Sequence, residues 1–173
     1  PQFHTIPEND EWWGPGFTEW TNVRRGAARF PGHHQPHVPS DLGHYDLRDD
    51  AVRAAQVDLA RAYGIDAFCY YHYWFDGRRL LHEPFDAALA SSEPDLPFML
   101  CWANEAWTRA WSGKSGVVLV DQRYSDADDL AHIRALLPAF ADPRYVRHEG
   151  KPVFLVYRAS DLPDATRTTD TWR

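Results

Sequence analysis

The chain alternates between apolar runs and amphipathic stretches. Three short runs, at residues 65–73, 97–103 and 152–157, carry apolar side chains on both faces. This pattern is typical of strands in a parallel sheet that is covered on both sides. A turn at residues 148–151 is expected to close a small hairpin ahead of the third strand, and residues 117–120 are a candidate edge strand.

Helical periodicity separates these strands. Residues 49–62 place apolar side chains at helical spacing behind two aspartates, and Gly64 follows as a stop signal. Pro84 suits the first position of a short helix that ends near Ser91. Residues 125–140 begin with a capping pattern and continue with periodic apolar residues. Pro138 is expected to kink or shorten that last helix.

The two ends of the chain lack either periodicity. In the first fifty residues, prolines and glycines are interleaved with aromatic residues and histidines. Because the tryptophans and phenylalanines favour burial, we expect an ordered loop rather than disorder. Residues 162–173 are polar without a pattern, and Met99 is the only methionine. We therefore expect Pro1 not to be a translation start and the chain to be a piece of a longer protein.

The alternation of strands and helices predicts βαβ units and a parallel sheet. Neither a Gly-x-Gly-x-x-Gly turn nor a P-loop lysine motif is present, which disfavours a nucleotide-binding sheet. An α/β barrel fits better, but a full barrel needs about 250 residues. We expect residues 1–173 to be one domain, the front part of a (β/α)8 barrel whose C-terminal part is missing and whose first strand lies ahead of Pro1 or just reaches it. Such a piece would expose sheet edges and would tend to aggregate.

Composition narrows the function. The formal net charge of −7 argues against a nucleic-acid or anionic-membrane surface. No apolar run approaches the roughly 20 residues of a membrane span, and no signal peptide is visible. Cys69 and Cys101 are interpreted as buried thiols rather than a disulfide or a nucleophile. The abnormal value is the aromatic content of 14%, with eight tryptophans.

The richest cluster follows the second predicted strand and contains Trp102, Asn104, Glu105, Trp107 and Arg109, with Trp111 beyond. Sugar rings need aromatic platforms together with amides, carboxylates and arginines for their hydroxyls. At the end of a barrel strand, Glu105 could serve as a proton donor, base or nucleophile. The alternative is that the tryptophans fill the layer between sheet and helices, while Glu105 pairs with Arg109 along a helical turn.

The first predicted strand ends in a second cluster, from Phe68 to Phe75. Strand alternation separates Tyr71 and Tyr73 from Tyr70 and His72, but the sequence leaves open which pair faces the barrel interior. His72 could bind a hydroxyl or relay a proton, or could equally be a hydrogen-bonded core histidine. Trp74 is a further candidate platform.

The opening loop holds a third group of candidates: Glu19, Trp20 and His37. Aromatic neighbours would raise the pKa of Glu19 if they bury it, although an ordinary loop-tying role is as plausible. The histidines at 33, 34, 37 and 44 have loose spacing and no nearby cysteine, so a zinc site is disfavoured. We expect no metal and no cofactor.

Several of these segments resemble the WbsX-like group, whose members carry a domain similar to glycoside hydrolase family 99. The resemblance covers nearly the whole chain. Its motifs are residues 1–10, 16–23, 30–39, 42–48, 68–75, 101–109 and 152–158.

This resemblance implies a (β/α)8 barrel that acts on glycosidic bonds, by transfer or hydrolysis, in bacterial lipopolysaccharide, O-antigen or polysaccharide biosynthesis. It implies an oligosaccharide or sugar donor as substrate and a cytoplasmic location, peripheral to the inner membrane through other parts of the protein. A non-catalytic glycan-binding module is the alternative. In the mannan-cleaving enzymes of family 99 the catalytic carboxylates lie later in the barrel, and no position here matches them. The candidate catalytic residues are Glu105 and Glu19; the candidate substrate-binding residues are Trp20, His37, Tyr71, His72, Trp74, Trp102, Asn104, Trp107 and Arg109.

Overall fold

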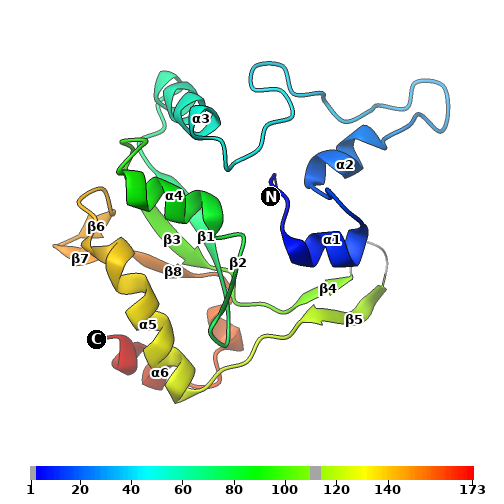
Figure 1. Cartoon of the computed structure of the whole chain (residues 1–173). Coiled ribbons are helices and arrows are strands. Elements are labelled where there is room, and N and C mark those ends of the chain that lie inside the picture. The colour runs from blue at the N-terminus through cyan, green and yellow to red at the C-terminus, as the bar shows by residue number, and fades with distance from the viewer. Residues whose placement is uncertain (1–2, 110–113) are drawn as a thin grey trace. The chain divides into compact units, whose positions relative to one another are not determined.

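A computed structural model describes residues 3–109 and 114–173. Trp111, Pro1 and Gln2 lie outside the described residues. The chain divides into two compact units. The first unit comprises Pro1–Ile65 and Asp86–Pro94, and the second comprises Asp66–Phe85 and Asp95–Arg173. Figure 1 labels the helices and strands of both units.

Within the described residues, the first unit holds three helices in residues 3–65 and residues 86–91 of a fourth. The helix predicted over residues 49–62 is confirmed as α3 (Asp50–Ala62). At its start, the Asp49 side chain accepts a hydrogen bond from the Ala51 amide. The expectation of a loop across the first fifty residues is wrong in part, because α1 (Pro7–Trp13) and α2 (Glu19–Arg24) lie there. Pro7 pre-sets the helical backbone for α1. Helices of two turns or fewer are too short to give a periodic pattern.

Aromatic packing orders the long segment after α2. The Phe3 and Trp20 rings stack at 4.3 Å between centroids. The Trp20 indole donates a hydrogen bond to the Tyr45 carbonyl at 2.8 Å, and the Leu47 amide donates to the Phe3 carbonyl at 3.2 Å. The segment therefore returns to the start of the chain. The expected burial of its aromatic residues is wrong for Phe30, which is 61% exposed.

The second unit is built on a four-stranded sheet of order β2-β1-β3-β8 (Figure 1). The predicted strands are confirmed as β1 (Phe68–Phe75), β3 (Phe98–Trp102) and β8 (Phe154–Val156), which are mutually parallel. The fourth strand, β2 (Arg78–Leu80), pairs antiparallel with β1. The fold is therefore a mixed α/β fold with a parallel sheet, and no barrel is closed by the described residues.

Helices connect these strands. Pro84 lies in α4 (Glu83–Ser91), as predicted. Helix α5 (Asp126–Ala141) begins with Ser125 accepting a hydrogen bond from the Asp128 amide at 3.1 Å, and it continues past Pro138 for three residues. Pro138 thus lies within the last turn, three residues before the helix ends.

The C-terminal stretch is also helical, contrary to the patternless interpretation. After the 3-10 turn η2 (Ala159–Asp161), Asp164 caps helix α6 (Ala165–Trp172). Thr168 and Trp172 of α6 hydrogen-bond to the side chain and the carbonyl of Asp129 in α5, at 2.7 and 3.1 Å. The Trp172 ring also packs against the rings of Trp102, His132 and Phe154. The stabilising contacts of α6 are thus long-range, and its eight residues are too few for a clear apolar period.

Two small hairpins complete the second unit. The expected hairpin is confirmed as β6 (Arg147–His148) with β7 (Lys151–Pro152). Residues 117–120 do form a strand, within β5 (Lys114–Val120). However, β5 pairs with β4 (Trp107–Arg109) as a separate hairpin and not at the edge of the main sheet.

The parallel sheet has two unlike faces. His72, Trp102 and Val156 form a paired row on one face, and His72 lies within 3.0 Å of His132 in α5. We call this the helix face. The neighbouring row of Tyr71, Cys101 and Leu155 is on the opposite face, which we call the open face because Tyr71 and Leu155 are 48% and 40% exposed.

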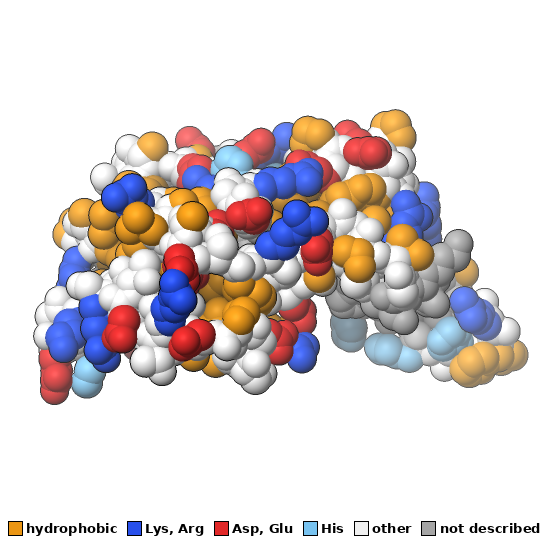
Figure 2. Space-filling model, turned by 90° about the horizontal axis from the view of Figure 1, so that it is seen from below, with side chains coloured by type: hydrophobic (Ala, Val, Ile, Leu, Met, Phe, Trp, Pro, Cys, Tyr) orange, Lys and Arg blue, Asp and Glu red, His pale blue; other side chains and the backbone are white. Residues whose placement is uncertain are grey.

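The surface shows no segregation by charge on the side drawn in Figure 2, where acidic, basic and hydrophobic side chains are intermixed. Among the described residues, no helix combines the length and the apolar character needed to cross a bilayer.

Candidate functional site

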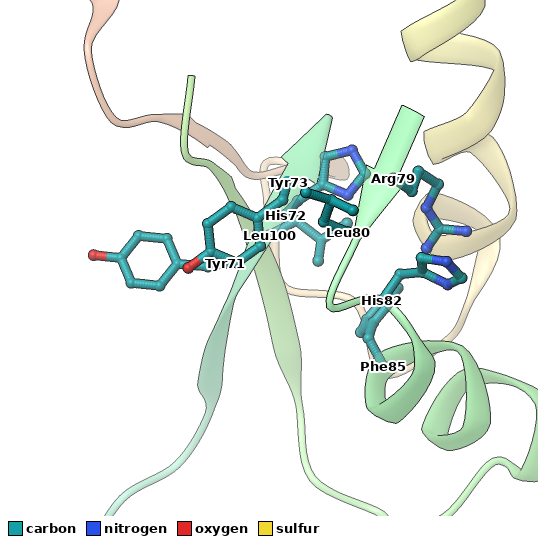
Figure 3. Close-up of a pocket in the computed structure, with 8 residues that line it drawn as sticks. All are labelled: Tyr71, His72, Tyr73, Arg79, Leu80, His82, Phe85 and Leu100. Carbon is teal, nitrogen blue, oxygen red and sulfur yellow. The ribbon is translucent and has the colours of Figure 1, made fainter. Parts of the chain in front are cut away.

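The two faces of β1 settle which aromatic residues share a side. Tyr71 and Tyr73 lie on the open face, and their rings are 6.1 Å apart. Figure 3 shows both tyrosines on one side of β1 and the His72 ring on the other. Of the alternatives that strand alternation left open, Tyr71 and Tyr73 are therefore the pair turned away from the helices.

His72 lies on the helix face in a buried aromatic network. Its Nε2 is 3.0 Å from Nε2 of His132, so one imidazole N–H donates to the other. The His132 ring stacks on Trp74 at 4.9 Å, and the Trp74 indole donates to Asp128 at 2.8 Å. Trp102 completes the layer with no exposed surface.

Burial dominates the electrostatics of this network. Burial, with a smaller contribution from the neighbouring His72, lowers the pKa of His132 to about 2. Burial also raises the pKa of the Asp128 carboxyl, against the hydrogen bond from Trp74. Asp128 and Asp129, in the first turn of α5, are both only 5% exposed. His72, Trp74 and Trp102 thus occupy the core layer of the second unit, in the positions that the core alternative describes.

Asn104 ties the ends of two strands together. Its side-chain oxygen accepts from the Arg158 amide at 2.8 Å, and its side-chain nitrogen donates to the Arg158 carbonyl at 2.9 Å. Tyr124 adds bonds to the Asn104 side chain and carbonyl. Asn104 is fully buried, so its amide fixes the carboxyl end of β3 against that of β8 and is not open to a ligand.

The next residue, Glu105, reaches the surface at this same edge. Its carboxylate lies 3.2 Å from the Arg158 guanidinium, and the two side chains are about half exposed. Arg158 also pairs with Asp161 at 2.9 Å. The alternative pairing of Glu105 with Arg109 is not the observed one, because residues 107–109 form a strand rather than a helical turn.

The tyrosines on the open face lie within electrostatic range of Glu105. Burial raises the pKa of Tyr73 to about 12, and the charge of Glu105 contributes. Burial and the same charge also raise the pKa of Tyr71. Both hydroxyls are therefore protonated at neutral pH and can donate hydrogen bonds.

Aromatic contacts extend the group. The Tyr73 ring meets Trp107 edge-on at 5.2 Å, and the Tyr71 ring meets Tyr157 edge-on at 6.2 Å. We call Tyr71, Tyr73, Glu105, Trp107, Tyr157 and Arg158 the carboxyl-end cluster, since they gather where the parallel strands end. This edge is where ligands bind in parallel α/β folds.

Three members of the cluster, Tyr73, Tyr157 and Arg158, are not among the site residues predicted from the sequence. For Tyr73, the available signal was the face that strand alternation makes it share with Tyr71. For Tyr157 and Arg158, it was their place at the end of the third predicted strand, residues 152–157, and directly after it, at the edge shared with Glu105. Their role depends on the pairing of β8 with β3, which is a long-range contact.

The remaining candidates lie elsewhere. Glu19 begins α2 and Trp20 packs on Phe3, both in the first unit. His37 is exposed in the same unit, with its ring 5.4 Å from that of His34. Arg109 ends β4, paired in the backbone ladder with Lys114. Each stays a prediction as a site residue.

Both cysteines lie on the open face and are free thiols. Cys101 is buried, as predicted, but Cys69 is exposed.

Beside β1, a small hollow is lined by Arg79, His82 and Phe85 among others (Figure 3). Within the described residues, no three His, Cys, Asp or Glu side chains gather as a metal site would require.

Comparison with known proteins identifies relatives over the whole chain. The sequence model of a family described as "Glycosyltransferase WbsX" matches residues 1–173. Two curated relatives, both called "Uncharacterized protein WxcX", come from Xanthomonas campestris pv. campestris strains B100 and ATCC 33913. Each is 50% identical over 173 residues, which is 100% of this chain and 25% of the relative. The chain thus spans a quarter of their length. No solved structure matches the chain.

Proposed function

Since the chain belongs to the glycosyltransferase WbsX family, we propose that it forms the sugar-binding front part of an enzyme acting on glycosidic bonds in bacterial cell-surface polysaccharide or lipopolysaccharide biosynthesis. The proposed site is the carboxyl-end cluster. The proposed architecture of the whole protein is a (β/α)8 barrel, to which this chain contributes β1, β3, β8 and their helices. Strands from the rest of the protein would then cover the open face.

The observation that carries this proposal is the meeting of Glu105 with aromatic rings at the carboxyl edge of the sheet. Tyr71, Tyr157 and Trp107 offer partly exposed rings for the C–H faces of a sugar. Glu105 and Arg158 offer an acceptor and donors for its hydroxyls. A packed core would bury these groups, whereas Tyr71, Glu105, Tyr157 and Arg158 are all exposed.

The chain's own groups support defined roles. Glu105 can accept a proton from a sugar hydroxyl or stabilise positive charge that develops at the anomeric carbon. Arg158 orients the Glu105 carboxylate, and Asn104 fixes the backbone of Arg158. The protonated Tyr73 hydroxyl can donate to a sugar oxygen. Glu19 is a second proposed carboxylate from the first unit.

Replacement of Glu105 in the full-length protein tests the proposal. Glu105→Gln keeps the size of the side chain, removes its charge and should lower turnover about 100-fold or more, with an unchanged melting temperature. The matched control is Glu149→Gln, which makes the same change at an exposed turn ahead of β8. Glu19→Gln is measured in parallel.

The assay uses a panel of oligosaccharides and nucleotide sugars, with binding and turnover measured separately. Unchanged turnover in Glu105→Gln removes Glu105 from the mechanism. Binding without turnover across the panel, in the unmodified protein, identifies a glycan-binding module instead of an enzyme. If the unmodified protein shows no binding and no turnover with any member of the panel, the proposed function as a whole is contradicted.

A further inference from the structure

The charges around Arg158 distinguish between anionic and uncharged sugars as possible ligands of the proposed site. The guanidinium lies 3.2 Å from Glu105 and 2.9 Å from Asp161, so two carboxylates share one cation. The three side chains are between 38% and 50% exposed. They therefore present themselves at the surface of the proposed site rather than in the core.

The sum of these charges is negative. Asp161 lies beside the carboxyl-end cluster through its ion pair with Arg158, so two carboxylates against one guanidinium leave −1 there, in a chain whose formal net charge is −7. An arginine that binds phosphate or carboxylate ligands does so with its own N–H groups, as a two-pronged donor. Here Glu105 and Asp161 already accept from that guanidinium.

An anionic ligand would have to displace one of these carboxylates and approach the other. The negative charges of the ligand and of the remaining carboxylate repel at such short range, and this repulsion lowers the affinity for an anionic ligand. A neutral sugar meets no such penalty, because its hydroxyls can donate to Glu105 and accept from Arg158. A protonated amino sugar would gain from the net negative charge.

We infer that the carboxyl-end cluster binds an uncharged or amino sugar unit and excludes uronic acids and the diphosphate of a nucleotide sugar. This inference rests on the proposed function and specifies its substrate class. The sugar unit held here is accordingly a neutral acceptor or a glycan residue. A diphosphate-bearing donor, if the enzyme uses one, has its phosphates bound at another place.

Binding to the full-length protein, measured with EDTA present to remove bridging cations, tests the inference. The probes are a neutral oligosaccharide, the matching oligosaccharide with one uronic acid, and uridine diphosphate. The neutral probe is expected to bind at least fivefold more tightly than either anionic probe. Asp161→Asn removes one negative charge and is expected to raise the affinity for the uronic acid probe about fivefold. Asp170→Asn, an equal charge change on α6, is the control.

The outcomes separate the two claims. Tighter binding of the uronic acid probe or of uridine diphosphate by the unmodified protein overturns the inference but leaves a sugar-binding site in place. An unchanged affinity for the uronic acid probe in Asp161→Asn overturns the role assigned to the shared guanidinium. Failure of all three probes to bind overturns the proposed function as well.

Discussion

The side chain of Asn104 holds the backbone of Arg158 from both sides, accepting from its amide at 2.8 Å and donating to its carbonyl at 2.9 Å. Although the two residues are 54 positions apart in the chain, this pair joins the ends of β3 and β8. The same two ends carry Glu105 and the Arg158 side chain, which form an ion pair. The buried amide thus positions the charged groups of the proposed site.

Replacement of this amide should cost stability as well as activity. Asn104→Ala leaves the Arg158 amide and carbonyl without these partners, and we expect the free energy of unfolding to fall by about 2 kcal/mol. Urea unfolding measures the change. Asn22→Ala, at an exposed position of α2, is the control and should change stability by less than about 0.5 kcal/mol. Equal effects of the two variants would contradict the assigned role of Asn104.

The buried His132 predicts loss of stability in acid. Its pKa is about 2 in the folded protein against an ordinary 6.5, so the unfolded chain binds the proton more readily. Its contribution is fully present above pH 6.5 and decreases as the pH falls toward 2. Between pH 7 and pH 5 we expect a loss of about 2 kcal/mol. At lower pH, the raised pKa of Asp128 opposes this trend, because its protonation relieves a buried charge.

The His132→Gln variant isolates this effect in urea unfolding measured at several pH values. Its stability should change less with pH than that of the unmodified protein. The fully solvated His148, which is more than 80% exposed, supplies the control variant His148→Gln. If all three proteins lose stability in parallel between pH 7 and pH 5, His132 is not the responsible group.

Replacement of the core residue Trp102 should mainly lower stability, whereas replacement of the proposed site residue Tyr71 should mainly weaken sugar binding. Trp102 has no exposed surface and donates its indole N–H to the Trp74 carbonyl, so Trp102→Ala should cost about 3–5 kcal/mol of stability. Tyr71 is half exposed, so Tyr71→Ala should cost less than about 1 kcal/mol but weaken sugar binding severalfold. Calorimetry measures the stability of both variants, and titration measures their sugar binding. A larger loss of stability in Tyr71→Ala than in Trp102→Ala would contradict the prediction.

The cysteines should differ in reactivity toward iodoacetamide. Burial raises the pKa of both thiols above the ordinary value of 9, so little thiolate is present at neutral pH. Cys69 is exposed and Cys101 is 8% exposed. We expect Cys69 to react slowly at pH 7 and faster above pH 9, and Cys101 to react only after unfolding. Mass spectrometry identifies the modified residue, and faster reaction at Cys101 would contradict its burial in the folded protein.

The sequence by itself determined the elements that have enough length or local signals to be marked. Helix α3 has thirteen residues and an aspartate cap, and α5 has sixteen with a serine cap. Strands β1, β3 and β8 are marked by apolar runs, and this also located Glu105 just beyond a strand end. Helices α1 and α2 were missed because seven and six residues are too few for a period.

The tertiary structure alone decided which face of each strand is covered. A period of two separates His72 from Tyr71, but only the packing of α5 shows that His72 is turned to the helices. It likewise assigned Trp74 and Trp102 to the core and gave Glu105 a partner 53 positions away. These contacts join residues that are distant in the chain, and local propensity carries no information about them.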